Sequence, residues 1–171
     1  MNGATFPTFL FVFLSACRVA PPAIADGGGA EGIPPPDAAL DSPVGQGYLA
    51  VEALRCGDCH QSPDPADGVL SGRTSPVATS DGGAAAYGSN LTPDPDTGMD
   101  AWDAGSIANA VRAGIDAQGR VLCGAMPKYA DASDDVAFAI AAYLRSLVPV
   151  WHPIPASTCP PVGPAPAADG G

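Results

Sequence analysis

Three stretches of the chain carry apolar residues at helical spacing, and each has a start signal and a stop signal of its own. The first covers residues 42–56 and begins with a serine followed by proline, a favourable helix start. The second covers residues 103–114, between a capping aspartate and a glycine. The third covers residues 133–149, with two aspartates in its first turn and proline at its end. The pattern therefore predicts an all-α protein with three main helices.

The same spacing predicts which face of each helix is buried. The apolar stripes are Val44, Tyr48, Val51 and Leu54 in the first helix, Ile107, Ala110 and Val111 in the second, and Val136, Ile140, Tyr143, Leu144 and Leu147 in the third. Between the first two helices, residues 61–100 are rich in Gly, Ser and Asp and show little periodicity. An irregular loop of that length is expected mainly where it wraps a ligand.

Composition divides the 171 residues into four parts. Residues 1–16 contain a short apolar run that is typical of a signal peptide and too short to span a bilayer. Residues 17–41 carry runs of Pro and Gly and are predicted to form a tether. Residues 42–159 form the predicted folded domain, and residues 160–171 are predicted to be a disordered tail.

The apolar run ends in Leu14-Ser15-Ala16-Cys17, which resembles the lipobox of bacterial lipoproteins. The resemblance implies cleavage before Cys17 and acylation of that residue, which would anchor the protein to a membrane. The alternative is an ordinary signal peptide with another cleavage site. Both interpretations predict an exported, periplasmic location, and Arg18 after the cysteine favours the outer membrane over the inner one by resemblance to known sorting signals.

Charge narrows the range of partners. The formal net charge is -11 at pH 7, so nucleic acid is excluded as a plausible partner and no basic patch is available for anionic lipid. We expect instead a redox partner protein with a basic docking face.

The strongest chemical signal is the run Cys56-Gly57-Asp58-Cys59-His60. Two cysteines three residues apart and a histidine directly after them are the attachment pattern of a covalent haem c. The two thiols form thioethers with the haem, and His60 is then placed to bind the iron. Two alternatives are a redox-active disulfide between Cys56 and Cys59 and a four-thiolate metal site that also uses Cys123 and Cys159.

The remaining cysteines suggest a structural crosslink. Once Cys17 is assigned to the anchor and Cys56 and Cys59 to haem, Cys123 and Cys159 are left. An oxidising compartment permits them to pair, and a closed loop of about 36 residues would stabilise the fold by roughly 4 kcal/mol. The alternative is two free thiols.

Several motifs together resemble a class I cytochrome c. The resemblance covers residues 44–150 and rests on the helix that leads into Cys-x-x-Cys-His, the run Ser-Asn-Leu-Thr-Pro-Asp at residues 89–94, Trp102, and the pair Met126-Pro127. It implies the cytochrome c fold, in which three main helices and long irregular loops surround one covalently attached haem. It also implies that the first and last helices cross.

The predicted crossing has candidate contact residues. Gly45 and Gly47 permit close approach of another helix, and Tyr48 and Tyr143 are expected nearby. A frayed helix start is the alternative explanation for the two glycines.

The resemblance also implies a ligand set. Met126 follows Gly124-Ala125 in a loop and precedes a stiffening proline, so it is the expected sixth ligand opposite His60. Met99 and His152 are the alternatives, and His152 otherwise belongs to a segment expected to lay Trp151 against the domain. Further residues expected to contact the haem or its propionates are Asn90 and Trp102, followed by Thr92, Arg112 and Tyr129.

These predictions converge on one-electron transfer by a lipid-anchored carrier that is not an enzyme. One alternative is a cytochrome subunit of a membrane oxidoreductase complex. Another is a haem protein with an open sixth position that acts as a peroxidase or binds a gas.

Overall fold

The structure is a computed structural model that describes residues 33–79 and 83–159. The predicted signal peptide, the acylation predicted at Cys17 and the predicted C-terminal tail lie outside the described residues. Within the described part, no helix is both long enough and apolar enough to cross a bilayer.

The first predicted helix is present but ends earlier than expected. Helix α1 spans Pro43–Ala53, and the Ser42 side chain caps it by accepting a hydrogen bond from the Gly45 N–H. Arg55 then takes a left-handed φ of 57°, which interrupts the helix before the cysteine motif. The chain resumes as the short helix α2, Gly57–His60. The prediction of one helix running into Cys56 is therefore wrong.

The other two predicted helices are confirmed. Helix α3 spans Ala104–Ala113, with Asp103 as its N-cap and Gly114 at a left-handed φ of 67° after its last residue. Helix α4 spans Asp134–Ser146 and is capped by Ser133, whose side chain accepts a hydrogen bond from Val136 N–H. The capping residues thus set both helix starts, as the sequence predicted.

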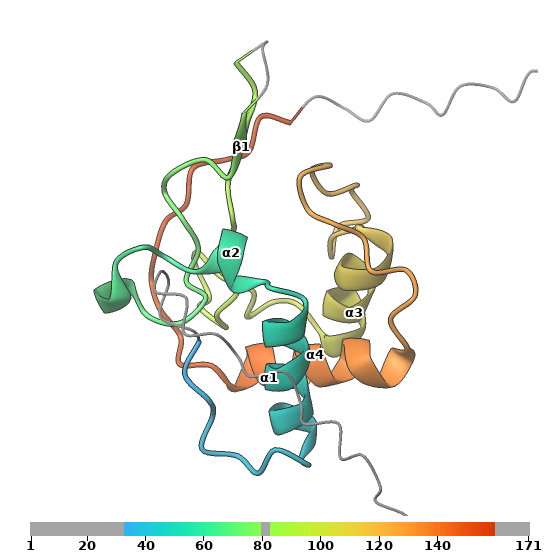
Figure 1. The fold of residues 1–171 in the computed structure, drawn as a ribbon. Helices are drawn as coiled ribbons and strands as arrows, with labels where there is room; N and C mark the ends of the chain where they lie inside the picture. Colours follow the sequence, from blue (N-terminus) through green and yellow to red (C-terminus); the bar gives the residue numbers. More distant parts are fainter. Residues whose placement is uncertain (1–32, 80–82, 160–171) are drawn as a thin grey trace, which may run out of the picture.

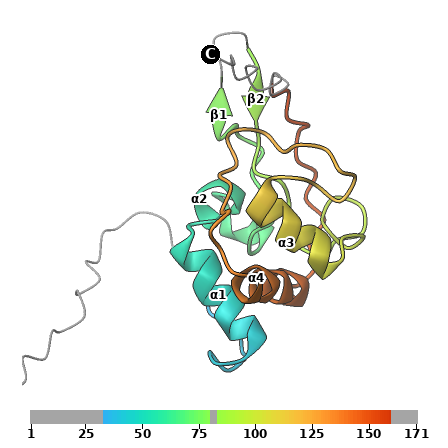
Figure 2. The same cartoon turned by 90° about the vertical axis from the view of Figure 1, so that its right-hand side faces the viewer.

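Helices α1 and α4 cross in close contact at one end of the molecule (Figures 1 and 2). A Cβ atom on Gly47 would lie 1.9 Å from the Ala139 carbonyl oxygen, so only glycine fits there. The rings of Tyr48 and Tyr143 meet edge to face with centroids 5.8 Å apart. The predicted role of Gly47 is confirmed.

Gly45 has a different neighbour from the one predicted. A Cβ on Gly45 would meet the backbone of residues 39–40 at 2.3 Å, which is the segment that leads into the helix. Gly45 therefore permits the chain to turn into α1 and does not lie at the crossing.

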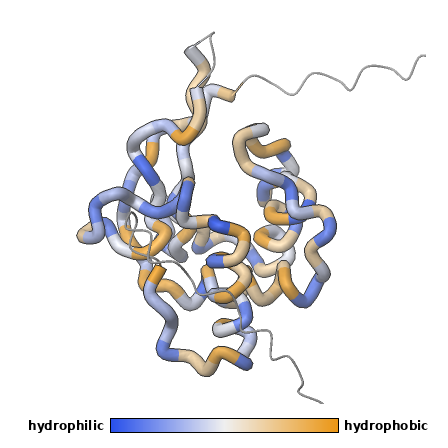
Figure 3. Tube along the Cα trace, in the orientation of Figure 1, coloured by the Kyte–Doolittle hydropathy of each residue, from blue (hydrophilic) through white to orange (hydrophobic). Residues whose placement is uncertain are grey.

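The buried core collects residues from all three main helices and from the flanking segments. Its apolar members are Ile33, Val51, Leu70, Ile107, Val111, Ile140, Ala141, Tyr143 and Leu144. Most of the predicted apolar stripes are confirmed, but Val136 is 38% exposed and lies outside this core. Figure 3 shows the polar character of the loop at residues 61–68 beside the more apolar helices.

The folded unit begins before the predicted boundary at Ser42. Ile33 is buried, and its backbone carbonyl accepts a hydrogen bond of 3.2 Å from the Tyr48 hydroxyl. A Cβ on Gly57 would lie 3.2 Å from the Ile33 side chain. The last part of the predicted tether is therefore packed against the domain.

The long loop between α2 and α3 contains three short elements that were not predicted. They are the 3-10 helix η1, Pro65–Asp67, and the antiparallel strands β1, Ala78–Thr79, and β2, Ala85–Ala86. The hairpin of β1 and β2 projects at the end of the molecule opposite the helix crossing, and the C-terminal segment runs beside it (Figure 1). Thr158 N–H donates to the Ala85 carbonyl at 2.8 Å, so this segment extends the hairpin.

Candidate functional site

Helix α2 contains Cys59 and His60 of the cysteine motif, and Cys56 is its N-cap residue, directly after the break that follows α1. Cys56 N–H donates to the Val51 carbonyl at 3.1 Å, which fixes the motif to the end of α1. Cys56 and Cys59 are both free thiols and both half-buried. The short helix α2 and its N-cap residue therefore present two unpaired thiols and the histidine that follows them.

His60 is held in one orientation by the loop that follows the hairpin. Its side chain is buried, and Nδ1 lies 2.8 Å from the Ser89 carbonyl oxygen. A carbonyl only accepts hydrogen bonds, so Nδ1 carries the hydrogen and Nε2 keeps its lone pair. Burial lowers the pKa of His60, which favours the neutral imidazole. This is the form and the orientation in which a histidine binds a metal.

The backbone of the cysteine motif is also in close contact with the segments around it. A Cβ on Gly88 would lie 1.7 Å from the Cys59 carbonyl oxygen, so the segment before Ser89 touches the motif directly. Gly72 N–H also donates to the His60 carbonyl at 2.8 Å. The sequence did not predict the contact from the Ser89 backbone, although Ser89 opens the Ser-Asn-Leu-Thr run on which the resemblance rests.

The environment of Cys56 differs from that of a nucleophilic Cys-x-x-Cys thiol. Burial raises the pKa of Cys56 to about 11, whereas nucleophilic Cys-x-x-Cys thiols have lowered pKa values. Cys123 and Cys159 form a disulfide with their Cα atoms 5.6 Å apart, so they are not available for a four-thiolate site. Among the described residues, no group of three His, Cys, Asp or Glu side chains is arranged to hold a metal ion.

Met126 lies in a turn where its N–H donates to the Cys123 carbonyl at 2.9 Å. Its side chain is half-buried, and in the described part of the chain it is not among the residues packed against the core. Met99, the competing ligand, does pack against that core. Of these two thioether side chains, only that of Met126 does not pack against the described core.

Tyr129 connects the Met126 loop to the cysteine motif. Its hydroxyl donates to the Leu54 carbonyl at 3.0 Å, and its N–H donates to the Val111 carbonyl at 3.0 Å. Tyr129 is three residues after Met126, and Leu54 is two residues before Cys56. The fold therefore brings the Met126 loop beside the end of α1 from which the motif begins.

Both polar atoms of the Asn90 side chain are hydrogen-bonded within the protein. Its side-chain nitrogen donates to Thr97 Oγ1 and the Val150 carbonyl, and its oxygen accepts from the N–H and the hydroxyl of Thr92. These four bonds use all the hydrogen-bonding capacity of a side-chain amide. Asn90 thus braces the loop against the C-terminal segment and has no polar group left for a cofactor.

The other predicted contact residues also have partners within the protein. Trp102 is half-buried against the core, and its carbonyl accepts a hydrogen bond from Arg145. Arg112 forms an ion pair with Asp134 at the start of α4. Contact of Trp102 with a haem stays a prediction.

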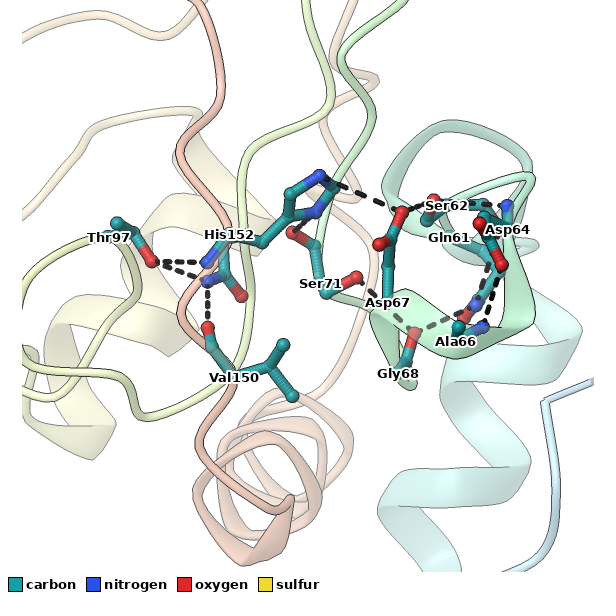
Figure 4. A network of polar contacts seen from close by, with 11 residues as sticks. Gln61, Ser62, Asp64, Ala66, Asp67, Gly68, Ser71, Thr97, Val150 and His152 are labelled. Atoms are coloured by element: carbon teal, nitrogen blue, oxygen red, sulfur yellow. Dashed lines mark hydrogen bonds and ion pairs between the residues drawn. The ribbon is translucent and has the colours of Figure 1, made fainter.

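His152 locks the C-terminal segment to the loop that follows α2 (Figure 4). Its Nδ1 lies 3.0 Å from the Ser71 carbonyl, its N–H donates to Thr97 Oγ1 at 3.0 Å, and its Nε2 lies 3.8 Å from an Asp67 carboxylate oxygen. These contacts fix the His152 ring between the two segments, and ligation by His152 stays an alternative from the sequence. Trp151 beside it is 67% exposed, so the prediction that it packs on the domain is wrong.

Comparison with known proteins gives one partial similarity. No protein-family model matches the chain. Over 73 residues it is 38% identical to a subunit of the nicotinate dehydrogenase of Pseudomonas putida. The match covers 42% of this chain and 6% of that protein, so the chain spans only a small fraction of this relative. The similarity links one stretch of the chain to a subunit of an oxidoreductase.

Proposed function

We propose that this protein carries one haem c, attached through Cys56 and Cys59, and transfers single electrons, and that His60 and Met126 would bind its iron. The observation that carries the proposal is the state of His60. Its buried ring donates from Nδ1 to the Ser89 carbonyl and keeps Nε2 available, directly after two free thiols. This combination suits covalent haem attachment with histidine ligation.

The residues of the site fit such a group. Neither cysteine of α2 is paired with another sulfur, and Met126 is not committed to the protein core of the described residues. The bound haem iron would supply a one-electron couple, and a neutral thioether ligand favours its ferrous state. A histidine and a methionine that stay bound in both oxidation states keep the rearrangement on transfer small.

The chain's own contribution is to position the ligands. The Ser89 carbonyl fixes the His60 ring and increases the basicity of Nε2. Tyr129 holds the loop that carries Met126 close to the end of α1. The proposed role is that of a carrier without catalysis of its own. Acylation at Cys17, a periplasmic location and a partner with a basic docking face remain predictions from the sequence.

A second candidate is an electron-transfer subunit of an oxidoreductase complex. The partial similarity to a subunit of nicotinate dehydrogenase favours it. The two candidates share the same haem site and differ in whether the protein is free or bound. Gentle purification from the native host separates them: a free carrier elutes alone, and a subunit elutes with a dehydrogenase that reduces its haem.

The proposal is tested by producing the full chain with a haem c maturation system. We expect the mature protein to gain the mass of one haem that acidified acetone does not extract. Cys56→Ser/Cys59→Ser should lose this covalent haem, while Cys123→Ser should keep it. A wild-type chain that leaves the maturation system without covalent haem would overturn the proposal.

A further inference from the structure

We propose that the Cys123–Cys159 disulfide restrains the Met126 loop against the haem site and thereby keeps Met126 bound to the iron. We call this disulfide and the Tyr129–Leu54 hydrogen bond, taken together, the frame of the site. The inference rests on the proposed function and assigns Cys123 and Cys159 as positioning residues for the sixth ligand. It goes beyond a general stabilising crosslink, because it predicts an effect on ligation that loss of stability elsewhere does not produce.

The Met126 loop has few attachments of its own. In the described structure, residues 123–128 make one backbone hydrogen bond, from Met126 N–H to the Cys123 carbonyl. Residues 124–125 and 127–128 are exposed. The loop is anchored before this segment by Leu122 N–H, which donates to the Gly114 carbonyl at 2.8 Å, and after it by Tyr129. The disulfide at Cys123 is therefore the strongest restraint within the segment.

The other end of the disulfide lies in a segment that is fixed to the hairpin. Thr158 N–H donates to the Ala85 carbonyl at 2.8 Å, and Thr158 Oγ1 accepts from Ala85 N–H at 3.0 Å. Ser157 Oγ accepts from Tyr87 N–H at 3.0 Å. Three hydrogen bonds thus pin the residues just before Cys159 to β2 and its continuation.

The chain then runs from this hairpin directly to the proposed iron ligand. Residues 85–87 are followed by Gly88, which touches the Cys59 carbonyl, and by Ser89, whose carbonyl accepts from His60 Nδ1. The disulfide therefore connects the Met126 loop to the residues that orient His60. The two proposed ligands are joined by a short path of fixed contacts.

The frame has a second side that does not involve the disulfide. There, the Tyr129 hydroxyl bonds to Leu54 and ties the far end of the Met126 loop to the start of the cysteine motif. With both sides intact, the loop is restrained at each end against the α2 side of the site. Without the disulfide, that side opens and the loop keeps its anchors at Leu122 and Tyr129.

The test uses the full, haem-loaded chain and the double variant Cys123→Ser/Cys159→Ser. We expect carbon monoxide to bind the ferrous variant about tenfold faster than the wild type or more, because the state without Met126 on iron is more populated. The far-red thioether-to-iron band of the ferric variant should weaken in parallel. Unchanged carbon monoxide binding and an unchanged band would overturn the inference.

A matched control separates positioning from general destabilisation. Ile140→Ala opens a cavity in the helix core, where Ile140 is 1% exposed, and lowers the unfolding temperature. It should leave the rate of carbon monoxide binding within about twofold of the wild type. An increase equal to that of the cysteine variant would mean that lost stability alone releases Met126, which contradicts the inference.

A second measurement applies if the double variant does not mature. Haem-loaded wild type is treated with excess dithiothreitol, whose two thiols give two electrons and two protons to the disulfide and close to a cyclic disulfide. Hydrogen exchange at residues 123–128 and carbon monoxide binding should both accelerate after treatment. If exchange in this segment and carbon monoxide binding are the same before and after complete reduction, the inference fails.

The two proposals fail in different ways. If untreated protein has no covalent haem, or if Met126→Ala leaves the far-red band in place, the proposed function itself is wrong. If untreated protein shows the band and loses it with Met126→Ala, but not with loss of the disulfide, only the frame is wrong.

Discussion

The two ends of this molecule are held together by different means. At the α1–α4 crossing, backbones touch at Gly47 and two tyrosine rings meet edge to face. At the other end, the backbone of Gly88 touches that of Cys59, and α2, the hairpin and the Met126 loop are further connected by hydrogen bonds and one disulfide. The first end is a packed interface between two helices, whereas the second joins loops mainly through polar contacts.

This difference indicates where a cofactor would contribute most. Among the described residues, the buried apolar core contains neither Phe nor Trp, and Phe138 is 49% exposed. Large aromatic side chains usually supply much of the apolar contact in a core. A haem bound at the loop end would add a flat apolar group where the chain has mainly polar links, so the two ends should respond differently to substitution.

Asn90→Leu should give the largest effect, because it breaks the network of the loop end. It removes four hydrogen bonds of a side chain that is 2% exposed and leaves their protein partners unsatisfied. We expect a loss of about 3 kcal/mol in the free energy of unfolding, measured by denaturant titration of the haem-loaded protein. Asn109→Leu, at an exposed position on α3, should change it by less than about 0.5 kcal/mol. Equal effects of the two variants would contradict the bracing role of Asn90.

Gly47→Ala tests the packed end. The added methyl group would meet the Ala139 carbonyl at 1.9 Å, so the helices must separate. We expect a loss of about 2 kcal/mol with the far-red band unchanged. The control is Gly105→Ala in α3, where the nearest atom lies 3.5 Å away and where the better helix former should stabilise by about 0.5 kcal/mol. A gain in stability with Gly47→Ala would show that the crossing is not close-packed.

Tyr48→Phe makes a smaller change at the same end. It removes the hydrogen bond to the Ile33 carbonyl and retains the aromatic pair with Tyr143. The expected cost is about 1 kcal/mol, together with faster proteolysis before residue 42. Wild-type proteolysis rates in the variant would indicate that Ile33 is held by its side chain alone.

Asp94→Asn should change the pH dependence more than the stability at neutral pH. The Thr97 hydroxyl and the N–H groups of Thr97 and Asp96 bond to this carboxylate and lower the pKa of Asp94. A carboxyl with a lowered pKa stabilises the fold above its unfolded-state pKa, and this contribution is lost as pH falls through the folded-state pKa. The variant should therefore show a shallower decline of unfolding temperature in acid. Superimposable acid profiles would show that the Asp94 carboxylate does not contribute to acid sensitivity.

The sequence predicted the limits of α3 and α4, the α1–α4 crossing and the Cys123–Cys159 disulfide, but it missed the contacts between distant loop residues. Capping residues and a left-handed glycine define α3 and α4 within single turns, so their limits follow from local rules. The bonds of Ser89 to His60 and of His152 to Ser71 join residues far apart in sequence. They depend on the path of irregular loops, for which no periodicity exists.

Two wrong predictions, the end of the first helix and the start of the folded domain, have the same origin. The break at Arg55 requires a left-handed residue that is not glycine, and nothing in the local sequence signals it. The burial of Ile33 depends on the surface offered by Tyr48 and Gly57, which exists only once the fold has formed. For the candidate site, the Cys-x-x-Cys-His spacing predicted the residues, but the group that orients His60 emerged only from the structure.

The most direct test of the proposed function is the ferric absorption spectrum in the far red, compared between Met126→Ala and Met99→Leu. Both remove a thioether, one from the exposed loop and one from a residue packed on the core. A His/Met-ligated haem predicts a weak far-red band that is present in the wild type and in Met99→Leu and absent in Met126→Ala. A band that survives in Met126→Ala, or that is missing from the wild type, would contradict the assignment of His60 and Met126 as the ligand pair.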